Sequence, residues 1–249
     1  MKQSPPLNHS RRQFLQTIAA AAGMAMGNLP LAMRAAAAEG GMKIGVIGSG
    51  RVGGTVGALW VKAGYEVMFS ARNLDEVKKL AGSLGPKASV GTPEQAAAFG
   101  EVLFFSVPYA ALPQLGKDLA EQIKGKIVLD SCNPITPRDG EMAKAAQAKG
   151  AGIASAEYLP GARIVRAFNS VGYNSLRSEA RRAGEKIAIP LAGDDEAALK
   201  IAAKLVKDAG FEPVIVGPLA RGKEFDVGTA VFGKALTARE LRRGLGLGS

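Results

Sequence analysis

Short apolar runs alternate with longer helix-type patterns along the chain from residue 42 onward. Continuous apolar runs bounded by polar or glycine-containing turns are typical of strands that are buried on both faces. Strands are predicted at 44–47, 66–70, 88–90, 102–107, 126–130, 163–168, 186–191 and 212–216, and the helices between them include 51–63, 74–84 and 194–209. This alternation predicts an α/β fold, a Rossmann-type doubly wound parallel sheet with helices on both faces.

The alternating pattern also defines the domain organisation. No repeat or low-complexity linker divides residues 42–220, so we expect them to form one domain. Within it, Thr92-Pro93-Glu94 opens a helix with a capping residue and a proline in the first turn. Residues 221–249 predict a small C-terminal elaboration, a helical tail whose glycine-rich end frays.

Residues 1–38 follow a different pattern from the rest of the chain. The run Ser10-Arg11-Arg12-Gln13-Phe14-Leu15-Gln16 precedes a weakly apolar stretch rich in Ala, Gly and Met, and small residues occupy 35–38. This order resembles a twin-arginine signal peptide cleaved after Ala38, and a plain N-terminal tail is the alternative. The pattern predicts a periplasmic or extracytoplasmic protein that contacts the membrane only during export by the twin-arginine pathway.

The first predicted strand runs into a glycine-rich turn, Gly48-Ser49-Gly50-Arg51-Val52-Gly53, and a helical pattern follows. In such a turn the first glycine permits the tight bend, the second lets the backbone approach a pyrophosphate, and the third lets the helix pack on the strand. The helix N-terminus adds free N–H groups and the positive end of its dipole. We therefore predict that residues 48–53 bind a dinucleotide; a strand–helix connection that binds nothing is the alternative.

Composition narrows the chemistry that such a domain can perform. The 249-residue chain has one histidine, His9, and one cysteine, Cys132. Because His9 lies in the N-terminal segment, the domain has no Ser-His-Asp or Cys-His site and no zinc site built from His and Cys. We therefore predict no catalytic side chain of these kinds and no metal site, and we expect Cys132 to be a buried small residue.

The formal net charge of +10 is spread over the chain. Residues 1–38 contain four basic residues and no acidic ones, which leaves +6 for the remainder, and the basic residues there are scattered. A nucleic-acid surface usually combines a basic stripe with interleaved aromatic residues. The composition therefore disfavours a nucleic-acid partner and suits an anionic small molecule.

The end of the second predicted strand bears on which dinucleotide binds. An NAD site usually ends this strand with Asp or Glu, whereas an NADP site places Arg and small hydroxyl residues there. Here the strand ends Phe69-Ser70-Ala71-Arg72-Asn73, and the first acid is Asp75. A guanidinium pairs with a phosphate, which a carboxylate would repel. We predict NADP, with Arg72 on the 2′-phosphate and Arg51 as a second cation; a plain surface turn at Arg72 is the alternative.

Motifs at the ends of later strands point in the same direction. They are Phe105-Ser106-Val107-Pro108, Leu129-Asp130-Ser131-Cys132-Asn133-Pro134, Arg166-Ala167-Phe168-Asn169-Ser170, Gly193-Asp194-Asp195, Gly210-Phe211-Glu212-Pro213 and Gly217-Pro218-Leu219. Together with the glycine loop and residues 70–73, they resemble the NADPH-dependent reductases of the deazaflavin coenzyme F-420. The resemblance spans about residues 42–220.

The resemblance implies direct hydride transfer between NADP and a deazaflavin or flavin, a small-molecule redox substrate. Such transfer needs two rings held close together without water, and no histidine. The site residues that it implies beyond the glycine loop are Ser70, Arg72 and Asn73 near the 2′-phosphate, Ser106, Val107 and Pro108 beside the nicotinamide, and Asn133 and Asn169 near an amide or the second ring. One departure puts a phosphate hydrogen bond in question: the family has Ser directly before the Arg, where this chain has Ala71.

Three functions remain open on the sequence. The first is an exported NADP-dependent oxidoreductase that carries its nucleotide out tightly bound or reduces it in place. The second is a non-catalytic NADP-binding module of an envelope redox complex. The third, a hydroxy acid or alcohol dehydrogenase, needs a proton donor, and Tyr109, Tyr158 and Tyr173 lie in no recognisable catalytic spacing. A homodimer and a monomer are both left open.

Overall fold

The computed structural model describes residues 41–71 and 73–248. The predicted signal peptide, residues 1–38, and the predicted phosphate ligand Arg72 lie outside the described residues. From residue 42 onward the chain forms one compact unit. In the described ranges, no helix combines the length and the hydropathy that crossing a membrane requires.

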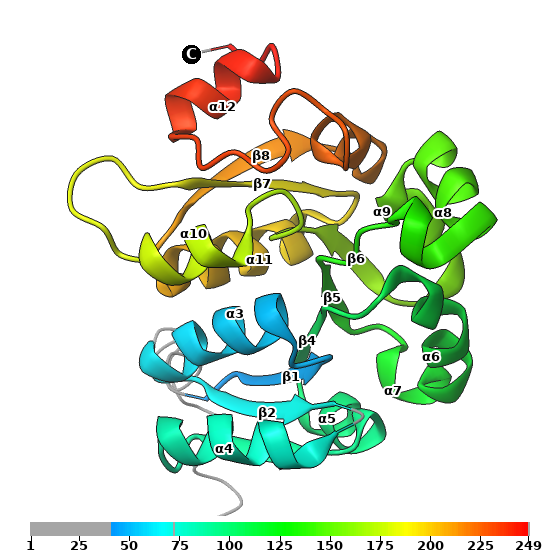
Figure 1. Cartoon of the computed structure of the whole chain (residues 1–249), viewed down its shortest axis with the longest axis vertical. Helices are drawn as coiled ribbons and strands as arrows, with labels where there is room; N and C mark the ends of the chain where they lie inside the picture. Colours follow the sequence, from blue (N-terminus) through cyan, green and yellow to red (C-terminus); the bar gives the residue numbers. More distant parts are fainter. Residues whose placement is uncertain (1–40, 72, 249) are drawn as a thin grey trace, which may run out of the picture. The chain divides into compact units, whose positions relative to one another are not determined.

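Strands and helices alternate along the described chain (Figure 1). The strands are β1 (Lys43–Ile47), β2 (Glu66–Ser70), β3 (Ala88–Gly91), β4 (Val102–Phe105), β5 (Ile127–Asp130), β6 (Arg163–Arg166), β7 (Ala188–Gly193) and β8 (Glu212–Gly217). The helices are α3 (Arg51–Lys62), α4 (Leu74–Leu84), α5 (Pro93–Phe99), α6 (Leu112–Asp118), α7 (Ala120–Ile123), α8 (Thr136–Lys149), α9 (Ala151–Tyr158), α10 (Tyr173–Ser178), α11 (Glu196–Ala209) and α12 (Ala238–Gly244), with 3-10 turns η1 (Tyr109–Ala111) and η2 (Leu219–Phe225).

The strands form one eight-stranded sheet in the order β3-β2-β1-β4-β5-β6-β7-β8. The chain therefore has the predicted Rossmann-like α/β fold. The prediction of a parallel sheet is wrong at one point, because β7 pairs antiparallel with β6 through Val165–Gly193 and Arg166–Ala192. To pair parallel with β6, β7 would need a crossover that carries the chain back to the end of the sheet at which β6 begins. The six-residue helix α10 does not do this, so β7 and its parallel neighbour β8 run opposite to the first six strands.

Two hydrophobic clusters lie on the two faces of the sheet. In β4 the side chains of Val102 and Phe104 join the cluster under α3 and α11, while those of Leu103 and Phe105 join the cluster under α5, α6 and α9. Trp60 of α3 packs edge-to-face against Phe104, with ring centroids 5.2 Å apart. Burial of both faces explains the continuous apolar run that predicted this strand.

Several strands differ in length or position from their predictions. β4 ends at Phe105 and β6 ends at Arg166, each two residues earlier than predicted. After β6, Phe168 has a φ of 58°, which an extended strand does not allow. β7 begins two residues late, and Ile187 instead forms an isolated bridge with Thr237.

The C-terminal segment is packed rather than frayed over its described residues. Phe225, Val231 and Leu241 form a third cluster with buried residues of β7 and β8. Helix α12 begins with a capping box between Thr237 and Glu240. Figure 1 shows α12 beyond β8, at the opposite end of the sheet from α4. The turn η2 runs across the predicted boundary at residue 220.

Candidate dinucleotide-binding site

The loops that carry the predicted motifs meet at one edge of the sheet, because β1, β4, β5 and β6 are parallel. Backbone hydrogen bonds join each strand end to the next: Ser106 N–H donates to the Ile47 carbonyl at 2.9 Å, and Ser131 N–H donates to the Phe105 carbonyl at 3.0 Å. Ala167 N–H continues the series to the Asp130 carbonyl at 3.1 Å. Ligands bind at this carboxyl edge in doubly wound sheets.

Packing explains two of the three glycines in the loop after β1. Gly48 has a φ of +95°, and a Cβ there would lie 2.5 Å from the Ser106 carbonyl oxygen. A Cβ on Gly53 would lie 2.0 Å from the Gly48 carbonyl oxygen, so only glycine lets α3 approach the loop. Gly50 differs, because a Cβ there would meet no atom within 4 Å. Its predicted role, to leave the backbone open to a pyrophosphate, remains a prediction.

The start of helix α3 offers unsatisfied hydrogen-bond donors. Its N-cap residue is Gly50, no side chain caps it, and its first turn holds no acid. The backbone N–H groups of a first turn have no partner within the helix. Side chains of Asn73, Thr92, Asp195 and Thr237 cap α4, α5, α11 and α12, whereas α6 to α10 also lack a side-chain cap. Beside α3, the buried hydroxyl of Ser49 has no hydrogen-bond partner in the described structure. Together these groups suit a phosphate.

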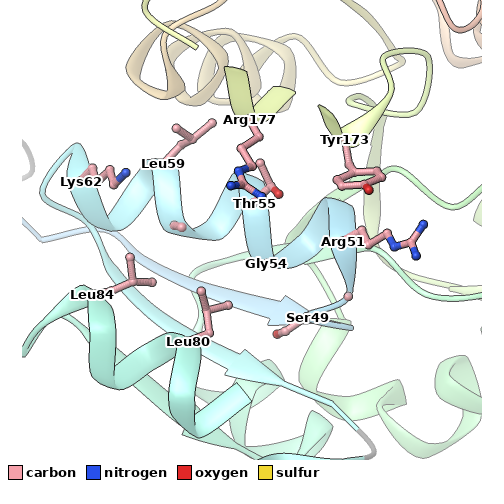
Figure 2. A pocket seen from close by; sticks show the side chains of 12 residues that line it. Ser49, Arg51, Gly54, Thr55, Leu59, Lys62, Leu80, Leu84, Tyr173 and Arg177 are labelled. Carbon is pink, nitrogen blue, oxygen red and sulfur yellow. The ribbon is translucent and has the colours of Figure 1, made fainter. Parts of the chain in front are cut away.

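A groove of about 480 Å³ runs from the glycine loop along α3 (Figure 2). Leu80 and Leu84 of α4 line one side, and Tyr173 and Arg177 of α10 line the other. The Arg51 guanidinium lies over the Tyr173 ring, 5.2 Å from its centroid. The α10 residues were not predicted to belong to the site, because no sequence motif contains them.

At the end of β2, the prediction that Ser70 binds the 2′-phosphate is wrong. Ser70 is fully buried, and its hydroxyl donates to the Val46 carbonyl at 2.8 Å. Alternation along the strand turns this side chain into the core, so Ser70 does not present its hydroxyl to a phosphate. Asn73 is exposed and caps α4 by accepting a hydrogen bond from Asp75 N–H at 3.1 Å.

The Ser-Val-Pro loop lies against the glycine loop. Ser106 and Val107 are half-buried and Pro108 is exposed. The backbone N–H of Val107 donates to the Cys132 Sγ at 3.4 Å. Cys132 is buried, as predicted, and burial raises the pKa of its thiol well above the ordinary value. A thiol held protonated in this way is a poor nucleophile.

The two predicted asparagines are brought together. Asn133 Nδ2 donates to the Asn169 carbonyl at 2.8 Å, and Asn133 Oδ1 accepts from Arg166 at 2.8 Å. Asn169 Nδ2 donates to the Phe225 carbonyl at 3.2 Å and to Asp226 at 3.3 Å. Asn169 Oδ1 is buried and has no hydrogen-bond partner in the described part of the chain.

A buried charge cluster supports these asparagines. Arg166 is fully buried and pairs with Asp130 at 3.0 Å and with Asp226 at 2.8 Å. Burial alone would lower the pKa of the guanidinium, but the two carboxylates raise it above its ordinary value. This cluster was not predicted from the sequence. The sequence does show a charged residue at the end of two apolar runs, Asp130 in IVLD and Arg166 in RIVR, which could have indicated an ion pair between neighbouring strands. Nothing in the sequence singles out Asp226.

Asp139 connects the loop after β4 to the loop after β5 through hydrogen bonds. Its carboxylate accepts from Ile135 N–H at 2.9 Å, from Ala110 N–H at 3.3 Å and from Arg138 at 2.8 Å. Burial raises the pKa of Asp139, but the hydrogen bonds from Arg138, Ile135 and Ala110 outweigh it and hold that pKa below the ordinary value. The ionised form therefore stabilises the fold.

We expect Asp139→Asn to lower the free energy of unfolding by about 1–3 kcal/mol at neutral pH, because the amide cannot accept all three donors. The folded-state pKa is lowered, so the carboxylate contributes fully above its unfolded pKa of 3.8, and the contribution is lost as the pH falls through the folded value. Urea unfolding of both chains at neutral pH and near pH 3 measures this. A difference that did not shrink in acid would contradict the assignment.

Among known protein families, residues 43–134 match the model of one described as NADP oxidoreductase, coenzyme F420-dependent. The match contains the glycine loop, the Ser-Val-Pro loop and the Asn-Pro turn. Arg166, Asn169 and Asp226 lie outside it.

One curated protein and two solved structures are also similar to this chain. The chain is 29% identical over 187 residues to metalloreductase STEAP3 of Rattus norvegicus, a match that covers 74% of this chain but spans only 36% of the relative's length. A hypothetical protein from Sinorhizobium meliloti has a similar structure, with a TM-score of 0.68 and 22% identity over 79% of this chain and 95% of that one. A putative F420-dependent NADP-reductase from Arthrobacter sp. FB24 has a TM-score of 0.59 and 22% identity over 79% and 99%. These structures confirm the Rossmann-like fold.

Proposed function

We propose that the chain is an NADP-dependent oxidoreductase that transfers hydride between NADP(H) and a deazaflavin or flavin. The observation that carries the proposal is the start of α3, where an uncapped helix, an open Gly50 and the unpartnered hydroxyl of Ser49 meet at the carboxyl edge. The family match over residues 43–134 supports the same reading.

The residues present fit a bound NADP. Residues 48–53 would hold the pyrophosphate through backbone N–H groups, and Ser49 would add its hydroxyl after rotation about χ1. Arg72 would hold the 2′-phosphate, since the sequence has no acid from Val67 to Asn73. When bound, the nicotinamide supplies or accepts the hydride. Residues 106–108 and the two asparagines would exclude water and orient the rings.

A non-catalytic NADP-binding module is the second candidate. It is favoured by the side chains at the edge, where the described carboxylates Asp130, Asp139 and Asp226 are all engaged in ion pairs. The dehydrogenase alternative is disfavoured. Tyr109 is buried and donates to the Ala151 carbonyl at 2.8 Å, and burial raises the pKa of its hydroxyl.

Twin-arginine export and the lack of a nucleic-acid partner stay predictions, and the oligomeric state, a homodimer included, stays open. Our proposal of export rests on the order of basic, apolar and small residues in 1–38.

Turnover separates the two candidates. The full chain is mixed with NADPH and, in turn, with oxidised coenzyme F-420 or FMN, while NADPH oxidation and NADPH affinity are measured. Hydride transfer to either ring supports the oxidoreductase. Tight NADPH binding without transfer supports the module, and lack of NADPH binding contradicts both.

We expect Arg72→Glu to weaken NADPH binding by about 10- to 100-fold and to leave NADH binding within about 2-fold, because a carboxylate repels the 2′-phosphate that the guanidinium would bind. Fluorescence titration with both nucleotides measures this preference. Arg243→Glu, at an exposed position on α12, makes the same charge change away from the glycine loop and serves as the control. Unchanged NADPH affinity in Arg72→Glu would remove Arg72 from the site.

A further inference from the structure

Asp226 connects the C-terminal segment to the carboxyl edge of the sheet. One oxygen accepts from Arg166 at 2.8 Å and from Asn169 at 3.3 Å, and the other accepts from the backbone N–H of Ala151 at 2.9 Å. Asp226 is 7% exposed, so these bonds lie out of reach of competing water. A buried carboxylate with such donors is held in one place.

Arg166 extends the influence of Asp226 to the neighbouring loop. Its guanidinium donates to the Cys132 carbonyl at 2.6 Å and to Asn133 Oδ1 at 2.8 Å while it pairs with both carboxylates. Because a guanidinium is planar and presents its donors in a fixed fork, holding one side fixes the other. Asn133 therefore takes its orientation from Arg166.

The orientation of the Asn169 amide follows from the same cluster. Its Nδ2 faces two acceptors, the Phe225 carbonyl and Asp226, so a flipped amide would set oxygen against oxygen. This fixes Oδ1 as the atom without a partner. A buried acceptor without a donor is destabilising, so its retention calls for an explanation.

Asn169 directly follows a residue with a strained backbone, Phe168, whose ring packing keeps it in place. Phe168 has a φ of 58°, which is unfavourable for a bulky residue. Its ring packs edge-to-face against Trp60 and Phe104, each at 5.8 Å, and against Phe211 at 6.2 Å. Strain of this kind persists only where the surrounding structure enforces it, and it gathers at functional sites.

Sheet order indicates which ligand Asn169 serves. The glycine loop follows β1, the Ser-Val-Pro loop follows β4, and Asn169 follows β6, two strands farther along. A nicotinamide beside the Ser-Val-Pro loop would leave the β6 end to the second ring. We propose that Asp226, through its contact with Asn169, is a positioning residue for the hydride acceptor, with Asn169 Oδ1 presented to a ring N–H; this rests on the proposed function.

The test compares Asp226→Asn with Asp130→Asn in the full chain. Both changes remove one carboxylate from Arg166, but only Asp226 contacts Asn169. An amide at 226 can donate as well as accept, so the Asn169 amide is free to flip. We expect Asp226→Asn to raise the KM for oxidised coenzyme F-420 by about 10-fold and its dissociation constant from the NADP-loaded chain equally, with NADPH affinity within about 2-fold.

Asp130→Asn should lower the melting temperature as much as Asp226→Asn does, but should raise the KM for oxidised coenzyme F-420 by less than about 2-fold. In an Asn169→Ala background, Asp226→Asn should raise the dissociation constant no further. Additive effects of the two changes, an equal KM effect of Asp130→Asn, or an equal loss of NADPH affinity would overturn the proposal. If the NADP-loaded chain bound oxidised coenzyme F-420 without turnover, the proposed function would be refuted and the positioning role would stand. If the chain bound NADP but not oxidised coenzyme F-420, the positioning role would be refuted.

Discussion

Replacing Gly50 by alanine is expected to weaken NADPH binding by about 10- to 100-fold without lowering the stability of the chain. Gly50 has φ −71° and ψ −156°, a conformation that alanine adopts, and its added methyl would meet no atom within 4 Å. The methyl would instead occupy the space in which a pyrophosphate approaches the helix N-terminus, at the cost of about 1–3 kcal/mol of binding. Fluorescence titration and thermal unfolding measure the two quantities.

Two other glycines provide controls for this prediction. Gly82→Ala adds a methyl to an equally open position within α4 and should leave NADPH affinity unchanged. Gly53→Ala should lower both affinity and stability, because its Cβ would overlap the Gly48 carbonyl oxygen. If Gly50→Ala bound NADPH as tightly as the unmodified chain, the nucleotide would not lie against this loop.

Removal of the Arg166 guanidinium should have the largest effect on stability. Arg166→Met keeps an unbranched apolar stem but leaves Asp130 and Asp226 buried without a cation, which should lower the free energy of unfolding by about 3–5 kcal/mol at neutral pH. Urea unfolding with a fluorescence readout measures the difference.

Further substitutions in that variant distinguish unpaired charge from a packing defect. Asp130→Asn and Asp226→Asn, added together to Arg166→Met, remove the two buried carboxylates that the variant leaves without a cation, and should restore part of the stability at neutral pH. If the triple variant were no more stable than Arg166→Met, lost packing, rather than unpaired charge, would cause the effect.

Local patterns predicted most of the fold. The apolar run of β4 and the glycine turn before α3 depend on neighbours in sequence, and the capping pattern Thr92-Pro93 placed the start of α5 at the observed residue. The direction of β7 was missed because it depends on whether the connection after β6 returns across the sheet, which no local pattern records. The packing of residues 221–248 was missed for a similar reason, since it depends on contacts of their apolar side chains with β7 and β8.

The candidate site was predictable where backbone geometry demands a residue type. Gly48 and Gly53 are required by turn and contact, and the sequence showed both. Ser70 was assigned to a phosphate by resemblance, although its position in the strand turns it toward Val46. The role of Asp226 could not be predicted, because it depends on a contact with Arg166 across 60 residues of chain.

The most direct test of the central claim follows deuterium from the C4 position of labelled NADPH to oxidised coenzyme F-420 in the presence of the full chain. A deazaflavin accepts hydride on carbon, so the label does not exchange with water. Deuterium should appear on the reduced ring in step with NADPH oxidation, and Gly50→Ala should slow both at subsaturating NADPH. A chain that binds NADPH but delivers no deuterium to the ring would contradict hydride transfer.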